Sequence, residues 1–201
     1  MFDTIIDPTI GPAADADRGR TALATRPADL SGLRLGLLAN TKRNAADFLE
    51  EVAGLLESRH GAKAVITRTK PSIVHPAPAE MVEELRAEAD IVVIGVGDCG
   101  SCSASAVADG LQLEAAGIPS VVLVSDAFRV SADAMAALQG TPGYQYVTTP
   151  HPVASLTREG VRGRAEQALP ELVALLSGPG GAAGQGGAAR QGGAVGQGGA
   201  A

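Results

Sequence analysis

The sequence predicts a single three-layer, Rossmann-like α/β domain with a mostly parallel sheet of about five strands. Short apolar stretches alternate along the chain with longer segments whose apolar residues recur at helical spacing. The hydrophobic fraction is 45%, yet only 2% of residues are aromatic. The core must therefore consist mainly of Val, Ile, Leu and Ala, as in parallel sheets covered by helices. A chain of 201 residues is long enough for one such domain and short for two.

The regular pattern begins near residue 33 and predicts five strands that alternate with five helices. The stretch 91–96 is apolar at every position, which predicts a central strand buried on both faces. Pro170 lies inside the last predicted helix, at a position where a proline can kink or restart a helix. The expected strands are 34–39, 62–68, 91–96, 120–124 and 144–148, and the expected helices are 45–58, 79–89, 103–116, 131–138 and 158–176.

Three regions differ in composition. Residues 1–30 lack periodicity and predict an N-terminal arm packed on the domain, with a short edge strand at 4–6. Residues 31–177 form the predicted catalytic α/β domain. Residues 178–201 are almost only Gly, Ala and Gln, with a repeated Gln-Gly-Gly-Ala. Such a segment has no apolar face to bury, so we expect a disordered tail.

Charge and hydropathy exclude several classes of partner. The net charge is −6 and no basic stripe is present, which argues against nucleic acid. The longest apolar run is far below the roughly 18 residues that cross a bilayer, so we expect no membrane association. The first residues lack the basic and apolar regions of a signal peptide. These features predict a cytoplasmic protein.

Both cysteines of the chain lie in one Cys-x-x-Cys motif, directly after the predicted central strand. A disulfide that closes so short a ring stabilises a fold little, so the spacing favours redox chemistry, metal binding or a nucleophile with a neighbour. Cys99 is predicted at or just before a helix N-terminus, where free amides and the helix dipole favour a thiolate. Cys102, three residues on, could resolve a mixed disulfide on Cys99.

The remaining candidate residues follow the ends of predicted strands, where open parallel sheets bind ligands. Asp98 is either a helix cap or a proton acceptor, and His151, held between two prolines, is a candidate base, acid or metal ligand. We predict that Asp98, Cys99, Cys102 and His151 are catalytic. The predicted substrate-binding residues are Asn40, Lys42 (for an anionic substrate), His75, Ser101, Asp126 and Phe128.

The glycine pattern Gly-Val-Gly-Asp-Cys-Gly does not have the spacing of a dinucleotide-binding loop, and there is no Walker motif. No cofactor is therefore expected.

Several of these motifs resemble the UGSC family of (seleno)proteins, which is named for a Sec-Gly-Ser-Cys motif in which some members carry cysteine first. The resemblance rests on Val-Val-Ile-Gly-Val-Gly-Asp-Cys-Gly-Ser-Cys-Ser, on Leu-Glu-Ala-Ala-Gly-Ile-Pro and on Thr-Thr-Pro-His-Pro-Val-Ala-Ser-Leu-Thr. It extends upstream to Ile-Asp-Pro-Thr, Leu-Leu-Ala-Asn-Thr-Lys-Arg-Asn-Ala and Lys-Pro-Ser-Ile-Val-His-Pro-Ala-Pro, and so covers nearly all of residues 1–176.

A weaker resemblance is to the substrate-specific selenoprotein subunit of glycine reductase, which also has a Sec-x-x-Cys loop after a strand and a later Pro-His-Pro. It implies that Cys99 stands where selenocysteine would be, with Cys102 as its partner and His151 in the Pro-His-Pro site. The implied chemistry is attack of a selenolate or thiolate on the substrate, followed by reductive turnover. This chain departs from that pattern in carrying sulfur at both positions.

Three functions are consistent with the sequence. The first is a thiol-dependent oxidoreductase or reductive-cleavage enzyme acting on a small molecule, with a thiol reductant or redox partner protein. The second is a redox-neutral lyase or transferase in a biosynthetic pathway, with Cys99 as covalent nucleophile. The third is a metal-binding module that uses Cys99, Cys102 and His151, with Asp98 or His75 as the fourth ligand.

Overall fold

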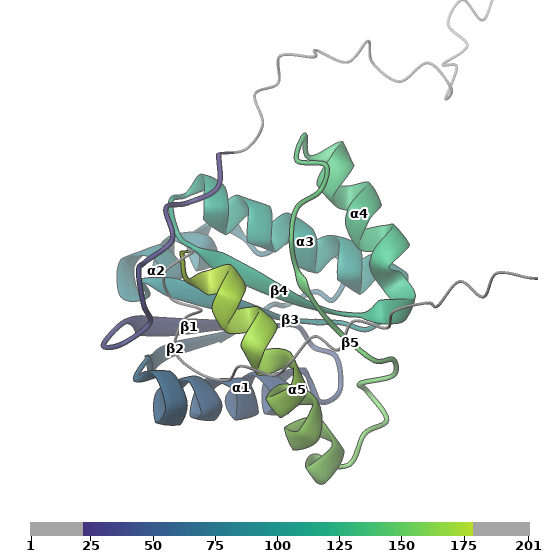
Figure 1. The fold of residues 1–201 in the computed structure, drawn as a ribbon. Helices are drawn as coiled ribbons and strands as arrows, with labels where there is room; N and C mark the ends of the chain where they lie inside the picture. The colour runs from purple at the N-terminus through teal and green to yellow at the C-terminus, as the bar shows by residue number, and fades with distance from the viewer. Residues whose placement is uncertain (1–21, 179–201) are drawn as a thin grey trace, which may run out of the picture.

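The computed structural model describes residues 22–178, in which five parallel strands form one sheet between two layers of helices (Figure 1). This confirms the predicted Rossmann-like α/β domain, and the sheet is parallel throughout. The strands are β1 (Arg34–Ala39), β2 (Lys63–Thr69), β3 (Ile91–Gly97), β4 (Ser120–Ser125) and β5 (Val147–Thr149). The helices are α1 (Ala45–His60), α2 (Ala79–Glu88), α3 (Gly100–Ala115), α4 (Arg129–Leu138) and α5 (Arg158–Leu176), with a 3-10 turn at Asp126–Phe128. The expected edge strand at 4–6 and residues 179–201 of the expected tail lie outside the described residues.

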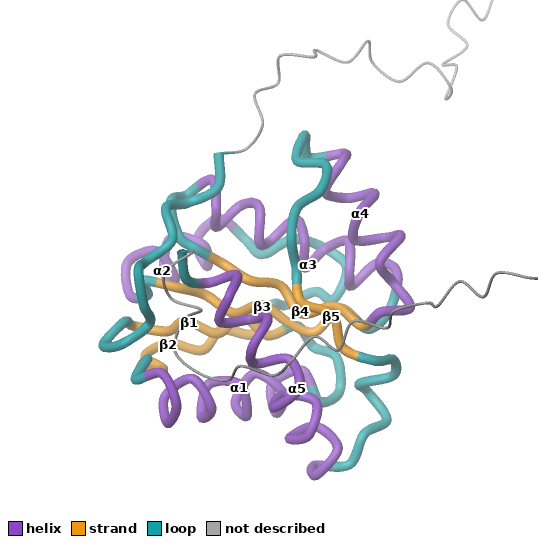
Figure 2. Tube along the Cα trace, in the orientation of Figure 1, coloured by secondary structure: helices purple, strands orange, loops and turns teal. Residues whose placement is uncertain are grey.

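Each face of the sheet has its own apolar core. Helices α1 and α5 cover one face, and α2, α3 and α4 cover the other (Figure 2). Strand β3 is buried at all seven positions, as its unbroken apolar sequence predicts. Most elements differ from the expected bounds by one to three residues at their ends. Strand β5 is shorter because Tyr144 and Tyr146 pack into the core beside α3 and α4, and do not pair with β4.

Helix α5 runs through Pro170 over the predicted bounds, so the proline does not restart the helix. Proline removes one backbone N–H and so leaves the carbonyl of Glu166, four residues earlier, without its helical partner. Both residues are on the exposed side of the helix, where water can bond that carbonyl.

A buried carboxylate joins the N-terminal segment to the domain. Both Glu114 carboxylate oxygens accept hydrogen bonds from the Arg26 guanidinium, and one also accepts from the Ala24 amide. Arg26 donates in addition to the Leu175 carbonyl at the end of α5. Residues 24–26 therefore pack where α3 and α5 end.

The strands lie in the order β2-β1-β3-β4-β5, and this order indicates where the sheet would bind a ligand. After β1 the chain leaves to one side for β2, and later strands add on the other side of β1. In open parallel sheets, ligands bind beyond the carboxyl ends of the strands at such a reversal. The loops after β1 and β3 meet there, because the amide of Asn40 bonds the carbonyl of Gly95 and its side chain bonds that of Val96. Within residues 22–178 no helix is long and apolar enough to cross a membrane.

Candidate active site

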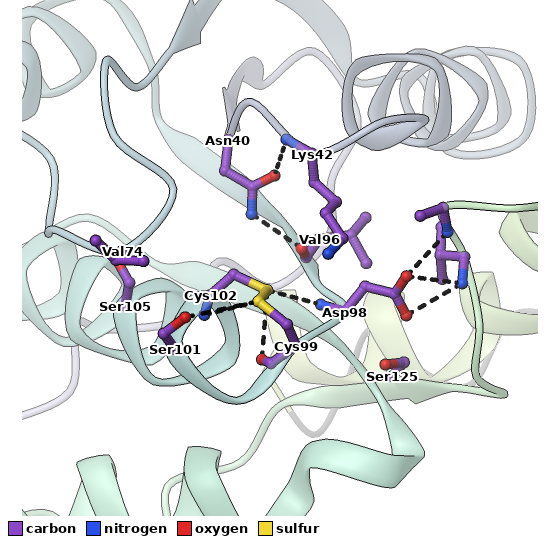
Figure 3. Close-up of a disulfide and its surroundings, with 12 residues drawn as sticks. Asn40, Lys42, Val74, Val96, Asp98, Cys99, Ser101, Cys102, Ser105 and Ser125 are labelled. Atoms are coloured by element: carbon purple, nitrogen blue, oxygen red, sulfur yellow. Dashed lines mark hydrogen bonds between the residues drawn. A yellow bond between two sulfur atoms is a disulfide. The ribbon is translucent and has the colours of Figure 1, made fainter.

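Cys99 and Cys102 form a disulfide at the carboxyl end of β3, the central strand (Figure 3). Cys99 caps the N-terminus of α3 and has extended backbone, while Cys102 lies in the first turn. Cys99 is partly exposed, whereas Cys102 is fully buried. The pair therefore has one sulfur that solvent can reach and one that is shielded.

Backbone amides point at both sulfurs. The Cys102 amide donates to the Cys99 sulfur over 3.3 Å, and the Asp98 amide donates to the Cys102 sulfur over 3.2 Å. The Ser101 hydroxyl is 3.7 Å from the Cys99 sulfur. Amide donors and the positive end of a helix favour the charged form of a thiol. The reduced loop is thus arranged to stabilise thiolate.

Two glycines of the loop lie in close contact with neighbouring elements. A Cβ on Gly97 would lie 2.7 Å from the Ser103 hydroxyl and 2.8 Å from its Cα. Gly97 is therefore needed because α3 starts directly against the end of β3. At Gly100 the nearest atom to such a Cβ is the Ser131 hydroxyl at 3.3 Å, so this position brings the loop beside α4.

Asp98 is not the helix cap, which is the role of Cys99. Its side chain is only 2% exposed, and its oxygens accept from the amides of Val153 and Ala154 at 2.9–3.1 Å. Burial alone would raise the pKa of Asp98. Hydrogen bonds from Ala154, Val153, Ser125 and His151 together outweigh it and lower the pKa. Asp98 is therefore a buried carboxylate that ties the cysteine loop to the loop after β5.

His151 is joined to the cysteine loop through Asp98. Its Nδ1 lies 2.9 Å from the Asp98 carboxylate and 3.3 Å from the Ser125 hydroxyl. A carboxylate only accepts, so Nδ1 carries the proton and Nε2 remains free to take or give one. The Asp126 carboxylate accepts the His151 amide over 3.0 Å, and the Phe128 ring meets the imidazole edge to face at 5.2 Å. The side chain is 38% exposed, so it is oriented on one side and open on the other.

The two candidates after β1 have different roles. Asn40 is buried, and its amide group donates to the Val96 carbonyl while its carbonyl oxygen accepts from the Lys42 amide. It holds two loops together, and each polar atom of its side chain already has one hydrogen-bond partner. Lys42 is partly exposed, and its side chain extends toward the Val96–Asp98 segment that leads into the disulfide (Figure 3).

His75 is not part of this cluster. It is exposed in the loop after β2, where its Nδ1 lies 2.9 Å from the Ser72 hydroxyl. Buried Lys70 fixes this loop, because its ammonium donates to the His75 carbonyl and forms an ion pair of 2.5 Å with Asp109 of α3. Asp109 also accepts the Ala77 amide. No contact within residues 22–178 joins the His75 imidazole to the cysteines.

Sequence reasoning did not assign a role to two residues that shape the site. Ser125 is fully buried at the end of β4 and contacts His151. Asn44 has a positive φ of 66° ahead of α1, and its side chain donates to the carbonyls of Val153 and Leu156. The sequence did show an Asn just before a helix and a Ser at the end of an apolar strand. Residues of these types are common at such positions in proteins where they have no functional role.

The donors named for a metal site do not converge. Within the described part of the chain, no group of three or more His, Cys, Asp or Glu side chains is placed to hold a metal ion. The cysteines are bonded to each other, and Nδ1 of His151 is occupied by Asp98.

Comparison with known proteins gives a family and no close functional relative. The sequence model of the UGSC family matches residues 4–178. No curated protein matches the chain. One similar solved structure is an ABC transporter permease from the Pseudomonas fluorescens group, 16% identical, with a TM-score of 0.38 over 71% of this chain and 32% of that one. This chain thus spans about a third of that protein.

A second similar structure is the FMN-dependent cysteine decarboxylase SpaF, 14% identical, with a TM-score of 0.38 over 69% of this chain and 98% of that one. At these values neither structure informs function. The resemblance to the glycine reductase subunit is not supported by these comparisons and stays a prediction.

Proposed function

The chain belongs to the UGSC family, and we propose that it is a thiol-dependent oxidoreductase that reductively cleaves a small molecule with Cys99 and Cys102. One observation carries this proposal: the two cysteines are within bonding distance at the carboxyl edge of the sheet, one partly exposed and one buried. This is the arrangement that a nucleophile and a resolving thiol require.

In the first step the Cys99 thiolate attacks an electrophilic sulfur or other heteroatom of the substrate. A bond forms between that atom and the Cys99 sulfur, and the bond to the leaving group breaks. The leaving group departs with the electron pair and takes up a proton. In the second step the Cys102 thiol loses its proton and attacks the Cys99 sulfur, which forms the disulfide and releases the rest of the substrate. The substrate gains two electrons from the two cysteines and two protons, one lost by the Cys102 thiol and one lost when the Cys99 thiolate formed.

In this scheme His151 donates the proton to the leaving group. Its Nδ1 is held by Asp98, so protonated Nε2 could act as general acid and neutral Nε2 as general base. Asp98 does not itself transfer a proton in this scheme, since its pKa is lowered. It is a positioning residue for His151.

A dithiol reductant or redox partner protein completes the cycle by reducing the disulfide through thiol–disulfide exchange. A reducing cytoplasm would keep the pair in its dithiol form between turnovers.

The test uses dithionitrobenzoate as a model substrate on protein reduced and freed of reductant. The wild type should release two molecules of thionitrobenzoate per chain and end with the disulfide. Cys102→Ser should release one and retain the other as a mixed disulfide, seen by intact mass. Cys99→Ser is the matched control and should react slowly, because Cys102 is buried.

Fast reaction of Cys99→Ser would show that the exposed sulfur is not the nucleophile. Complete release from Cys102→Ser would remove the resolving role and favour the redox-neutral enzyme with Cys99 as its single nucleophile.

A further inference from the structure

We infer that the substrate of this dithiol site is an anion, such as a carboxylate, and that Lys42 is the residue that recognises its charge. The inference rests on the proposed function, because it concerns what approaches Cys99.

The first observation is the placement of Lys42. Its amide is fixed by the Asn40 side chain, which also bonds the end of β3. The lysine side chain then extends toward Val96 and Asp98, the residues that lead into the disulfide (Figure 3). Two loops that meet at the carboxyl edge of the sheet thus bring Lys42 to the same edge as the cysteine loop.

The second observation concerns the charge partners of Lys42 among the described residues. Within residues 22–178 Lys42 forms no ion pair, whereas Lys70, Arg26, Arg34 and Arg68 each have a carboxylate partner. The carboxylates of the site are otherwise engaged. Asp98 accepts from two amides and His151, and Asp126 accepts from the His151 amide. Within residues 22–178, this edge therefore presents a positive group that has no carboxylate partner.

The third observation concerns α3, whose sixteen residues begin at the disulfide with no acidic residue in the first turn. In this turn the Cys102 amide donates to the Cys99 sulfur and the Ser103 amide to the Cys99 carbonyl. The amides of Gly100 and Ser101 precede the first intrahelical bonds. The positive end of the helix and Lys42 therefore act in the same direction on a charged group that approaches Cys99.

The consequence is selection by charge. An anionic substrate gains attraction from Lys42 as its electrophilic atom reaches the Cys99 sulfur, and a neutral analogue of equal size does not. In a partly exposed site, one unit charge near the reacting sulfur changes the rate at which Cys99 reacts with a charged substrate by roughly three- to tenfold.

The test compares iodoacetate with iodoacetamide, two alkylating reagents that differ in charge and react with a thiolate in the same way. Rates are measured on reduced Cys102→Ser protein, so that only Cys99 is alkylated and no disulfide can re-form. The ratio of the iodoacetate rate to the iodoacetamide rate cancels any change in the thiolate fraction of Cys99.

We expect Lys42→Gln to lower this ratio roughly three- to tenfold and Lys42→Arg to preserve it. The matched control is Lys63→Gln, an exposed lysine at the amino end of β2 and so at the opposite edge of the sheet. It should leave the ratio unchanged. Added salt should reduce the wild-type ratio toward that of Lys42→Gln.

An unchanged ratio in Lys42→Gln, with Cys99 still reactive, would overturn the inference and leave the dithiol function intact. A Cys99 that reacts with neither reagent would instead count against the proposed function, so the two failures are distinguishable.

Discussion

Replacing Asp98 by Asn tests the buried carboxylate that joins the cysteine loop to His151. In the wild type one oxygen accepts from His151 and Val153, and the other from Val153 and Ala154. The amide of Asn can accept through only one oxygen, and its NH2 group then faces a donor. Hydrogen bonds to a charged group contribute about 1.5–3 kcal/mol each, and a buried donor left unpaired costs about 1–3 kcal/mol. We therefore expect Asp98→Asn to lower the free energy of unfolding by about 2–4 kcal/mol at pH 7.

The pH dependence gives this prediction a second signature. The pKa of Asp98 is lower in the folded protein than in the unfolded chain, because hydrogen bonds from Ala154, Val153, Ser125 and His151 outweigh its burial. A depressed pKa stabilises the fold fully above the unfolded value of about 3.9, and this contribution is lost as pH falls through the folded pKa. The difference between the wild type and Asp98→Asn should therefore be largest at neutral pH and shrink below about pH 4.

The assay is urea denaturation of the oxidised proteins, followed by circular dichroism because the chain has no Trp. The control is Asp126→Asn, an exposed carboxylate that accepts only the His151 amide among the described residues, for which we expect a loss below about 1 kcal/mol. A loss in Asp98→Asn no larger than in this control would refute the reasoning. So would a difference from the wild type that is the same at pH 3 as at pH 7.

Two further predictions concern the supports of the site. Lys70→Met leaves the buried Asp109 carboxylate with the Ala77 amide as its remaining hydrogen-bond partner among the described residues. This variant should lower the free energy of unfolding by about 3–5 kcal/mol. The double variant with Asp109→Asn removes the uncompensated charge and should recover part of that loss; no recovery would show that the charge is not the cause. Gly97→Ala would place a Cβ too close to Ser103 and should lower the free energy of unfolding by about 1–3 kcal/mol. The control is Gly163→Ala, because a Cβ at this position inside α5 meets open space. This variant should raise the free energy of unfolding by about 0.4–1 kcal/mol. Similar effects at the two positions would contradict the close approach at Gly97. Both pairs are measured by the same urea denaturation.

Local patterns in the sequence were sufficient to predict the fold class. Strand β3 is apolar at every position because helices cover both faces of the sheet, and α1 repeats its apolar residues at helical spacing because only one side meets the core. The position of Cys99 at the start of α3 followed from the same pattern, since a helix must begin after the strand ends. These are properties of neighbouring residues, so the chain displays them before it folds.

Contacts between distant residues were decided only by the tertiary structure. Asp98 could have been a cap or a proton acceptor, and its partners Val153, Ala154 and His151 lie more than fifty positions away. Lys70 and Asp109 are 39 positions apart in the sequence, and only the fold buries them together as an ion pair. His75 was grouped with the site because it follows a strand, yet its strand, β2, is at the edge of the sheet and its loop turns over α3.

The physical reason is that periodicity reports which side of an element is buried, and not which element covers it. The sequence alone determined the alternating α/β pattern, the parallel sheet and a cysteine pair at a helix start. The order of the strands is set by how five elements pack at once, and it determined which of the predicted loops share an edge. That order brings Lys42, Asp98, the cysteines and His151 to one edge of the sheet and leaves His75 outside the cluster.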